Sequence, residues 1–369
     1  MASNQQRKNF ERLFIRPILN TICPKWLRNH IITLKMRVKL YFSPIKYQFH
    51  KGNIEVGNRL CVFVSFQTRG ILPTTWKYLQ HLKENLGYSI VLISNCPLQK
   101  KDIPALQTLC VEAIERDNIG YDFGAYKDGI LRYMEKLGNK FDELETLLIA
   151  NDSVIGPIYD MSPIHDQMQA EDCDFWGMND AFEHRDVFKL NTKSIPHVCS
   201  YFVCFKNNLL KTEIFKNLWK KMEYPSGRKF AIHNEKKLTQ YCLNNKFAYS
   251  VFVKKEDIIT YISQNEFDSN LFFGNYIVPF LETNNPYLLI STAHTNIMCP
   301  MFDITHFGMP LMKRDLIKRD LVNMSIFKAI LNKHEKQLTQ IVTKEEILDE
   351  MGLNPRTANS IFKWKKYII

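Results

Sequence analysis

The sequence has no closely paired cysteines: its nine cysteines are scattered, and none belongs to a CxxC pair. That pattern argues against a disulfide scaffold or a zinc ribbon and favours a reducing compartment. Uninterrupted apolar runs of about 18 residues are also missing, so we expect no membrane-spanning helix. No compact apolar segment with a small-residue cleavage site follows the basic N-terminus, so we expect no secretory signal.

The composition is that of a folded protein with basic ends. Hydrophobic residues make up 45% and charged residues 24% of the 369 residues, which fits one large domain or two ordinary ones. Of the net charge of +11, residues 1–60 carry +10, residues 61–312 carry −4 and residues 313–369 carry +5. A uniformly basic nucleic-acid-binding domain has a different pattern, so no nucleic-acid partner is expected. We therefore divide the chain into a basic N-terminal arm (1–58), a central domain (59–312) and a C-terminal helical extension (313–369).

The N-terminal arm mixes basic side chains with apolar ones such as Phe10, Phe14, Trp26 and Ile31. This mixture is typical of segments that bind an anionic membrane surface, which places the protein in the cytoplasm or at the inner face of the cell membrane. A solvated, partly ordered arm is an equally good interpretation. Residues 34–40 alternate strictly between apolar and basic, which is the periodicity of a strand.

The central domain alternates between strand and helix patterns. Short apolar runs at residues 59–66, 89–94, 110–114 and 145–150 predict buried strands, and residues 74–86 and 126–137 predict helices. Strands and helices that alternate in this way form an α/β fold with a mostly parallel sheet flanked by helices. Further on we expect strands at 174–178 and 200–205, helices at 210–222 and 234–243, a loop-rich surface at 269–312, and a helix capped by Thr343 and Glu346.

Two polar segments follow predicted strands, where ligands of open α/β sheets bind. After the third strand, Gly120 and Gly124 would let the backbone approach a ligand closely, and Asn118 and Asp122 would offer polar groups to a ribose or sugar. After the fourth strand comes the segment Asn151-Asp152-Ser153. A carboxylate there is costly unless something pairs with it, and Mg²⁺ or Mn²⁺ carrying a diphosphate is one such partner. A simple turn followed by Gly-Pro is the alternative.

The runs RDNIGYDFGAYKDGI (116–130), LLIANDSVIGPI (147–158), DFWGMND (174–180) and HVCSYFVCFKNNLL (197–210) resemble the rhamnan synthesis protein F family of bacterial glycosyltransferases. The resemblance extends in order from about residue 61 to residue 321. It implies a GT-A type nucleotide-sugar-binding fold. It also implies transfer of L-rhamnose or a similar sugar, from dTDP-rhamnose or another nucleotide sugar, to a growing surface polysaccharide or lipopolysaccharide. The acceptor would be a glycan or lipid-linked glycan, and the reaction would invert the anomeric configuration.

The same resemblance assigns roles to residues of the donor site. Ser65 and Gln67 would contact the nucleotide base, and Asp152 would bind the divalent cation with His294 as a second ligand. Where the wider fold carries Asp-x-Asp, this chain has a single carboxylate, so a weak cation site or metal independence would follow. Lys313, with Arg314, would neutralise the diphosphate. Further donor contacts would come from Asn118, Gly120, Tyr121, Asp122, Gly124 and Asn151.

An inverting enzyme needs a base that takes the proton of the acceptor hydroxyl. Glu235 is the first candidate and Asp180 the second. Glu235 would equally suit a structural role at a helix N-terminus, and Asp180 could instead bind the acceptor. Two other functions compete with this one: a catalytically silent nucleotide-sugar binder, and a nucleic-acid-binding protein that uses a helix-turn-helix within residues 343–364.

Overall fold

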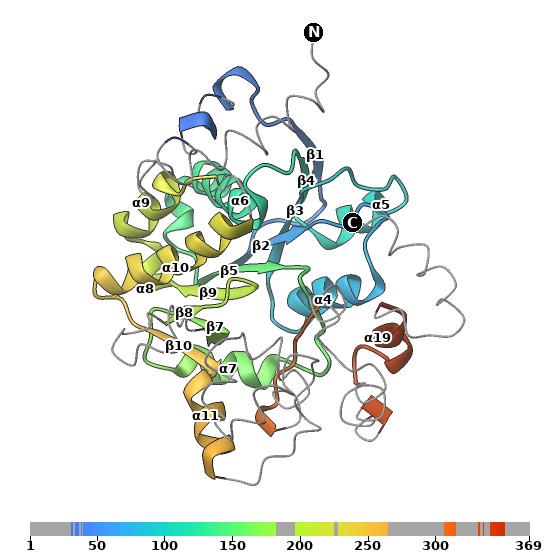
Figure 1. Ribbon diagram of the computed structural model, residues 1–369. Helices are drawn as coiled ribbons and strands as arrows, with labels where there is room; N and C mark the ends of the chain where they lie inside the picture. Colours follow the sequence, from blue (N-terminus) through green and yellow to red (C-terminus); the bar gives the residue numbers. More distant parts are fainter. Residues whose placement is uncertain are drawn as a thin grey trace, which may run out of the picture.

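The computed structural model describes residues 40–181, 196–224, 228–264, 306–314 and 340–350, with isolated positions between 31 and 38 and between 331 and 335. The described strands are β1 (Tyr47–Lys51), β2 (Arg59–Ser65), β3 (Ser89–Ser94), β4 (Glu112–Arg116), β5 (Thr146–Asn151), β6 (Val154–Ile155), β7 (Phe175–Ala181), β8 (His197–Val198), β9 (Phe202–Lys206), β10 (Tyr249–Val253) and β11 (Met312–Lys313). Nine of them form one sheet in the order β1-β4-β3-β2-β5-β9-β7-β10, with β8 paired to β7 (Figure 1). The other two, β6 and β11, pair with each other.

The middle of the sheet is parallel because helices connect its successive strands as crossovers, and these helices also bury the strands on both faces. β3, β2 and β5 consist almost entirely of apolar residues, and β4, β3, β2 and β5 pair in parallel. β1 and β9 run antiparallel to their neighbours, and β7 pairs in parallel with β10. The predicted α/β fold with a mostly parallel sheet flanked by helices is confirmed.

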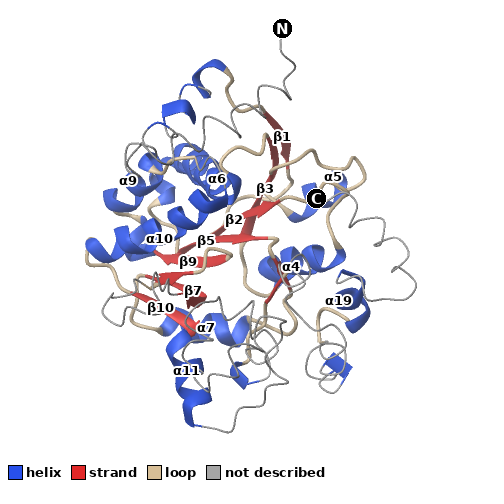
Figure 2. Cartoon of the chain, viewed as in Figure 1, coloured by secondary structure: helices blue, strands red, loops and turns tan. Residues whose placement is uncertain are grey.

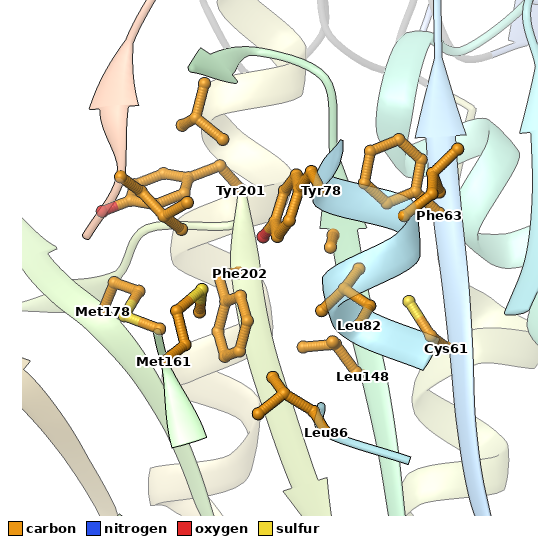
Figure 3. Close-up of a cluster of buried hydrophobic side chains, with 14 of the residues drawn as sticks. Cys61, Phe63, Tyr78, Leu82, Leu86, Leu148, Met161, Met178, Tyr201 and Phe202 are labelled. Carbon is orange, nitrogen blue, oxygen red and sulfur yellow. The ribbon is translucent and has the colours of Figure 1, made fainter. Parts of the chain in front are cut away.

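Helices cover both faces of the sheet (Figure 2). On one face lie α6 (Tyr121–Leu137), α8 (Asn207–Leu210), α9 (Glu213–Lys221) and α10 (Arg228–Asn244); on the other lie α4 (Pro73–Glu84), α5 (Ile103–Leu109), α7 (Ser162–Ala170) and α19 (Lys344–Glu350). The alternation along β2 explains the two cores: Cys61 and Phe63 face the α4 side, while Leu60, Val62 and Val64 face the α6 side. Figure 3 shows part of the first core, where side chains of α4 pack among residues of the sheet, including Phe202 of β9.

Several predicted elements differ from the observed ones, and the helix predicted at 210–222 is replaced by two helices, α8 and α9. The alternating segment 34–40 is helical at its described positions rather than extended. β4 begins at Glu112 instead of residue 110, since Cys110 closes α5. α6 begins five residues earlier than predicted, at Tyr121, so the glycine-containing segment opens a helix. α10 begins at Arg228 instead of residue 234.

The sheet and its contacts extend past the predicted boundaries at residues 58 and 312, which stay predictions. β1 lies inside the predicted arm and pairs with β4, and β11 lies across the second boundary. The capping box predicted for α19 is present, because Thr343 Oγ1 accepts from the Glu346 amide at 3.2 Å and Glu346 Oε2 accepts from the Thr343 amide at 2.8 Å. Residues 265–305 and 351–369, which hold most of the predicted loop-rich surface and the second half of the predicted helix-turn-helix, lie outside the described residues. No helix in the described part of the chain is both long and apolar enough to cross a bilayer.

Candidate functional site

The candidate site lies at the edge where the parallel strands of the sheet end. β2, β3 and β4 succeed each other in one direction across the sheet, whereas β5 lies on the opposite side of β2. The order of strands therefore reverses between β2 and β5, and such a point leaves a crevice for a ligand beyond the strand ends. Ser65 ends β2 and Asn151 ends β5, so the sequence prediction placed its donor residues on both sides of this point.

A hydrogen-bonded carboxylate joins the two strand ends. Asp152 Oδ2 accepts from Ser65 Oγ and from the Phe66 amide, each at 2.9 Å. Gln67, the other residue predicted to contact the base, uses its side-chain amide within the protein: Nε2 donates to Thr75 Oγ1 at 2.8 Å and Oε1 accepts from the Leu72 amide at 2.7 Å. The loop after β2 is thus held in place by its own polar side chains.

The turn after β5 connects the glycine-containing segment to Lys313. Asn151 Nδ2 donates to Asp122 Oδ2 at 3.2 Å, and Asn151 Oδ1 accepts from Ser153 Oγ at 2.5 Å. Ser153 Oγ in turn accepts from Lys313 Nζ at 2.9 Å. β11 pairs with β6 and sets Lys313 opposite Val154, which explains how a residue 160 positions downstream reaches this turn.

Lys313 also reaches the start of β9. Its Nζ lies 4.4 Å from the centre of the Tyr201 ring, within the range of a cation–π contact. The Tyr201 hydroxyl donates to Asn179 Oδ1 at 2.6 Å. The structure therefore brings four of the predicted site residues together at one edge of the sheet: Asn151, Asp152, Asp122 and Lys313.

The glycine-containing segment has a structural role in addition to its predicted one. Gly120 has a positive φ of 82°, and a Cβ on Gly124 would lie 2.4 Å from the Ile119 carbonyl oxygen and 3.0 Å from the Tyr224 ring. Both positions need glycine because the first turn of α6 packs tightly against Tyr224. The side chains of Asn118 and Tyr121 are exposed, so they remain open to a ligand.

A buried ion pair fixes this segment against the sheet. Arg116, at the end of β4, places Nε 2.9 Å from Asp128 Oδ2, and its Nη2 donates to the Ile119 carbonyl at 2.7 Å. The Tyr224 hydroxyl also donates to Asp128. Burial raises the pKa of Asp128 above its usual value, and the positive charge of Arg116 opposes that rise. Both charged residues belong to the RDNIGYDFGAYKDGI run, so part of that motif serves the fold.

The two candidate bases lie near the loop between β8 and β9. Glu235 lies in the middle of α10 and not at its start, so the predicted placement at a helix N-terminus is wrong. Its Oε1 accepts from the Ser200 amide, and its Oε2 lies 3.8 Å from His197 Nε2. Asp180 is the second-last residue of β7, and its Oδ1 accepts from the Lys255 amide at 2.8 Å.

Electrostatics connect both candidate bases with Lys313. Burial raises the pKa of Asp180, which suits a group that must accept a proton near neutral pH. Burial also raises the pKa of the Cys199 thiol; the negative charges of Glu235 and Asp180 raise it further, and the positive charge of Lys313 lowers it. The charges of Glu235, Asp180, Lys313 and Lys255 thus all influence this buried thiol.

The described residues do not by themselves fit the predicted divalent cation. No three His, Cys, Asp or Glu side chains of the described ranges converge in a way that could hold a metal ion. Asp152 Oδ2 already accepts two hydrogen bonds, and the neighbouring Asn151 turns its oxygen to Ser153. His294, the other predicted ligand, lies outside the described residues.

The sequence prediction missed several residues that shape this site. They are Asn95, Thr74, Thr75, Asp128, Tyr224 and Glu350, together with a buried role for Arg116 and Arg314. The pairing of Arg116 with Asp128 had one detectable signal, since opposite charges stand at both ends of the glycine motif. The others depend on contacts between distant parts of the chain, for which the sequence has no local pattern.

Curated relatives share part of this chain. The uncharacterized protein y4gN of Sinorhizobium fredii is 29% identical over 246 residues, which cover 61% of each chain. The virulence protein VirA of Vibrio anguillarum is 28% identical over 221 residues, which cover 56% of this chain and 65% of that protein. The chain thus spans somewhat less than two thirds of the length of these relatives.

Among solved structures, a glycosyltransferase involved in glycosylation of the major capsid of PBCV-1 matches 52% of this chain and 81% of its own. Its sequence identity is 14% and its TM-score 0.31. The model of the family described as rhamnan synthesis protein F matches residues 90–351, which include the turn after β5, both candidate bases and Lys313. Because this match covers well over half of the sequence, the chain belongs to the rhamnan synthesis protein F family.

Proposed function

We propose that this protein is a glycosyltransferase that moves a sugar from a nucleoside diphosphate to a glycan. The observation that supports the proposal most is a network of polar side chains at the sheet edge between β2 and β5, where the strand order reverses. Asp152 accepts a hydrogen bond from Ser65 and so connects the ends of these two strands. Lys313 is connected to Asp122 by hydrogen bonds through Ser153 and Asn151. This position receives nucleotides in open α/β sheets. Membership of a rhamnan synthesis family supports L-rhamnose, supplied as dTDP-rhamnose, as the first sugar to test.

The proposed reaction is a single displacement with inversion. The acceptor hydroxyl oxygen attacks the anomeric carbon, the bond from that carbon to the diphosphate oxygen breaks, and the hydroxyl proton passes to a carboxylate. Glu235 is the first candidate for this base, because the Ser200 amide fixes one of its oxygens beside the loop that precedes Tyr201. Asp180 is the second candidate. The ammonium group of Lys313 would stabilise the negative charge that develops on the departing diphosphate.

A polysaccharide or lipid-linked glycan acceptor suits the N-terminal segment. Its described helical positions expose Leu34, Val38, Tyr41 and Phe42, and residues 1–60 carry a charge of +10. Apolar side chains beside basic ones bind anionic membrane surfaces. We therefore propose peripheral attachment at the inner face of the cell membrane, next to a lipid-linked acceptor.

A catalytically silent nucleotide-sugar binder is the second candidate function. It is favoured by the single carboxylate of the Asn151–Ser153 turn, one oxygen of which already accepts two hydrogen bonds. Such a protein would bind a nucleotide sugar and leave it intact.

The decisive experiment measures binding and turnover separately. Purified protein is titrated with dTDP-rhamnose and with UDP- and GDP-sugars, with and without Mg²⁺ or Mn²⁺, and hydrolysis or transfer is followed by release of the nucleotide. We expect Glu235→Gln to lower turnover by about 10²–10⁴-fold with little change in donor affinity, because glutamine still accepts from the Ser200 amide. Glu213→Gln, on the exposed start of α9, is the matched control and should leave both unchanged.

Each result has a distinct meaning. If no nucleotide sugar binds, the proposed function is wrong. Binding without turnover supports the silent binder. Full turnover in Glu235→Gln moves the role of base to Asp180, which Asp180→Asn then tests.

A further inference from the structure

A buried ion pair attaches the C-terminal helix α19 to the candidate site. The guanidinium of Arg314 pairs with the carboxylate of Glu350, and these side chains are only 10% and 6% exposed. Arg314 Nε donates to the Asp152 carbonyl at 2.8 Å, and the Arg314 amide donates to the Ser153 carbonyl at 2.9 Å. One residue thus holds the backbone of the turn after β5 and the last residue of α19.

The same guanidinium reaches the start of α4. Nη2 donates to Thr74 Oγ1 at 2.7 Å and to Thr75 Oγ1 at 3.1 Å. Thr75 Oγ1 also accepts from Gln67 Nε2, and Thr74 donates to Glu350. Arg314 therefore connects the loop after β2, the first turn of α4 and the turn after β5, which are the segments that border the proposed donor site.

The negative charge of Glu350 on α19 helps to compensate the buried positive charge of Arg314. A guanidinium removed from water is costly unless a carboxylate pairs with it, and Glu350 supplies that carboxylate. Burial lowers the pKa of Arg314 to about 10, in keeping with an enclosed position. The planar guanidinium can donate in several directions at once, which a lysine ammonium on a flexible stem does not reproduce.

We propose that α19 is a positioning element of the donor site: Glu350 orients Arg314, and Arg314 holds the Asp152–Ser153 turn and the start of α4 in the geometry that receives a nucleotide sugar. The reference to a nucleotide sugar rests on the proposed function. Arg314 acts through the backbone of the turn, so it is a positioning residue and not a catalytic one.

A second glutamate on the same helix provides the control. Glu346 pairs with Lys77 of α4 at 2.7 Å and accepts from the Thr343 amide at the start of its own helix, whereas Glu350 pairs with Arg314. Both glutamates attach α19 to α4, Glu346 through Lys77 and Glu350 through Thr74. The Glu346 pair is more exposed than the Glu350 pair, so a purely stabilising role of α19 predicts faster exchange throughout the chain in Glu350→Gln, whereas a positioning role predicts faster exchange in the turn after β5.

The test compares Glu350→Gln with Glu346→Gln in the full chain. Hydrogen–deuterium exchange is followed in the peptide that contains Asp152, whose amide donates to the Val64 carbonyl at 3.1 Å. We expect exchange there to be at least about tenfold faster in Glu350→Gln and unchanged in Glu346→Gln. Affinity for dTDP-rhamnose, or for whichever nucleotide sugar the wild type binds, should fall at least about tenfold in Glu350→Gln only.

The outcomes separate this inference from the proposed function. Equal exchange and equal affinity in the two variants would overturn the inference. If the wild type binds no nucleotide sugar, the proposed function fails, while the exchange measurement still decides whether α19 positions the turn. Should Glu350→Gln fail to fold, Glu350→Asp keeps the charge on a shorter side chain, and exchange near Asp152 must then rise without a change in distant peptides.

Discussion

The buried pair of Arg116 and Asp128 offers the sharpest test of how the glycine motif is held. The side chain of Arg116 is fully buried and that of Asp128 is 10% exposed, with 2.9 Å between Nε and Oδ2. Replacing Arg116 by methionine keeps an unbranched side chain but removes the charge. The carboxylate of Asp128 then stays in an enclosed place with the hydroxyls of Tyr47 and Tyr224 as its neighbours.

The expected loss is that of one partner removed from a buried ion pair. Such losses are about 3–5 kcal/mol in the free energy of unfolding, whereas exposed pairs contribute about 0–1 kcal/mol. The exposed pair of Arg59 and Glu145, with side chains 30% and 49% exposed, is the matched control. Arg59→Met should therefore cost much less than Arg116→Met.

The loss in Arg116→Met should also depend on pH. Burial already raises the pKa of Asp128 and Arg116 opposes the rise, so removing Arg116 raises that pKa further. A carboxyl group with a raised pKa in the folded state takes up a proton there before the unfolded chain does. The variant should thus recover part of its stability as the pH falls from about 7 to about 5.

The assay is urea unfolding of wild type, Arg116→Met, Asp128→Asn and the double variant at both pH values. We expect a coupling free energy of at least about 2 kcal/mol between the two sites at about pH 7. A coupling below about 0.5 kcal/mol, or a loss in Arg116→Met no larger than in Arg59→Met, would refute the buried-pair explanation.

Two further predictions concern acid stability and membrane contact. Burial lowers the pKa of His165 from 6.5 to about 4, so the unfolded chain binds a proton that the folded protein excludes, and stability falls by up to about 3 kcal/mol as the pH drops through this interval. The free energy of unfolding of His165→Gln, measured in urea, should depend less on pH than that of the wild type. An identical pH dependence would contradict the role given to His165. His81, whose pKa is also lowered by burial, contributes equally to both proteins. Tyr41 and Phe42 are 83% and 79% exposed, and replacing both by serine should weaken sedimentation with phosphatidylglycerol vesicles at least about tenfold. Wild-type protein that fails to sediment with these vesicles at low salt would show that the exposed rings do not serve membrane binding.

The strands beside the candidate site were the most predictable part of the fold. The apolar runs at 59–66, 89–94 and 145–150 match β2, β3 and β5 to within a residue or two, because strands buried on both faces are almost purely apolar. The same regularity located Asp152 at a strand end. β1 gave no such signal, since its sequence YQFHK is largely exposed and its partner Arg116 lies 69 positions away from Tyr47.

The candidate site was only partly predictable, for a related reason. Glycine and carboxylate positions stand out in a sequence, and they identified Gly120, Gly124, Asp122 and Asp152. The sequence could not indicate that Tyr224 packs against both glycines, because that contact joins segments about a hundred positions apart. The ion pair between Arg314 and Glu350 was hidden in the same way, although Glu350 belongs to the predicted helix capped by Thr343 and Glu346.

The pairing of β1 with β4 bears on where this chain can be shortened. All five residues of β1 match residues of β4 in register, from Tyr47 opposite Arg116 to Lys51 opposite Glu112. A chain that begins at residue 59 would lack β1, so the backbone N–H and C=O groups along that edge of β4 would lose their hydrogen-bond partners. Such an exposed edge can pair with a strand of another molecule. The truncation would also remove the Tyr47 hydroxyl from Asp128. We therefore expect the segment before residue 59 to protect the sheet edge from pairing with a second molecule, in addition to its proposed role in membrane binding.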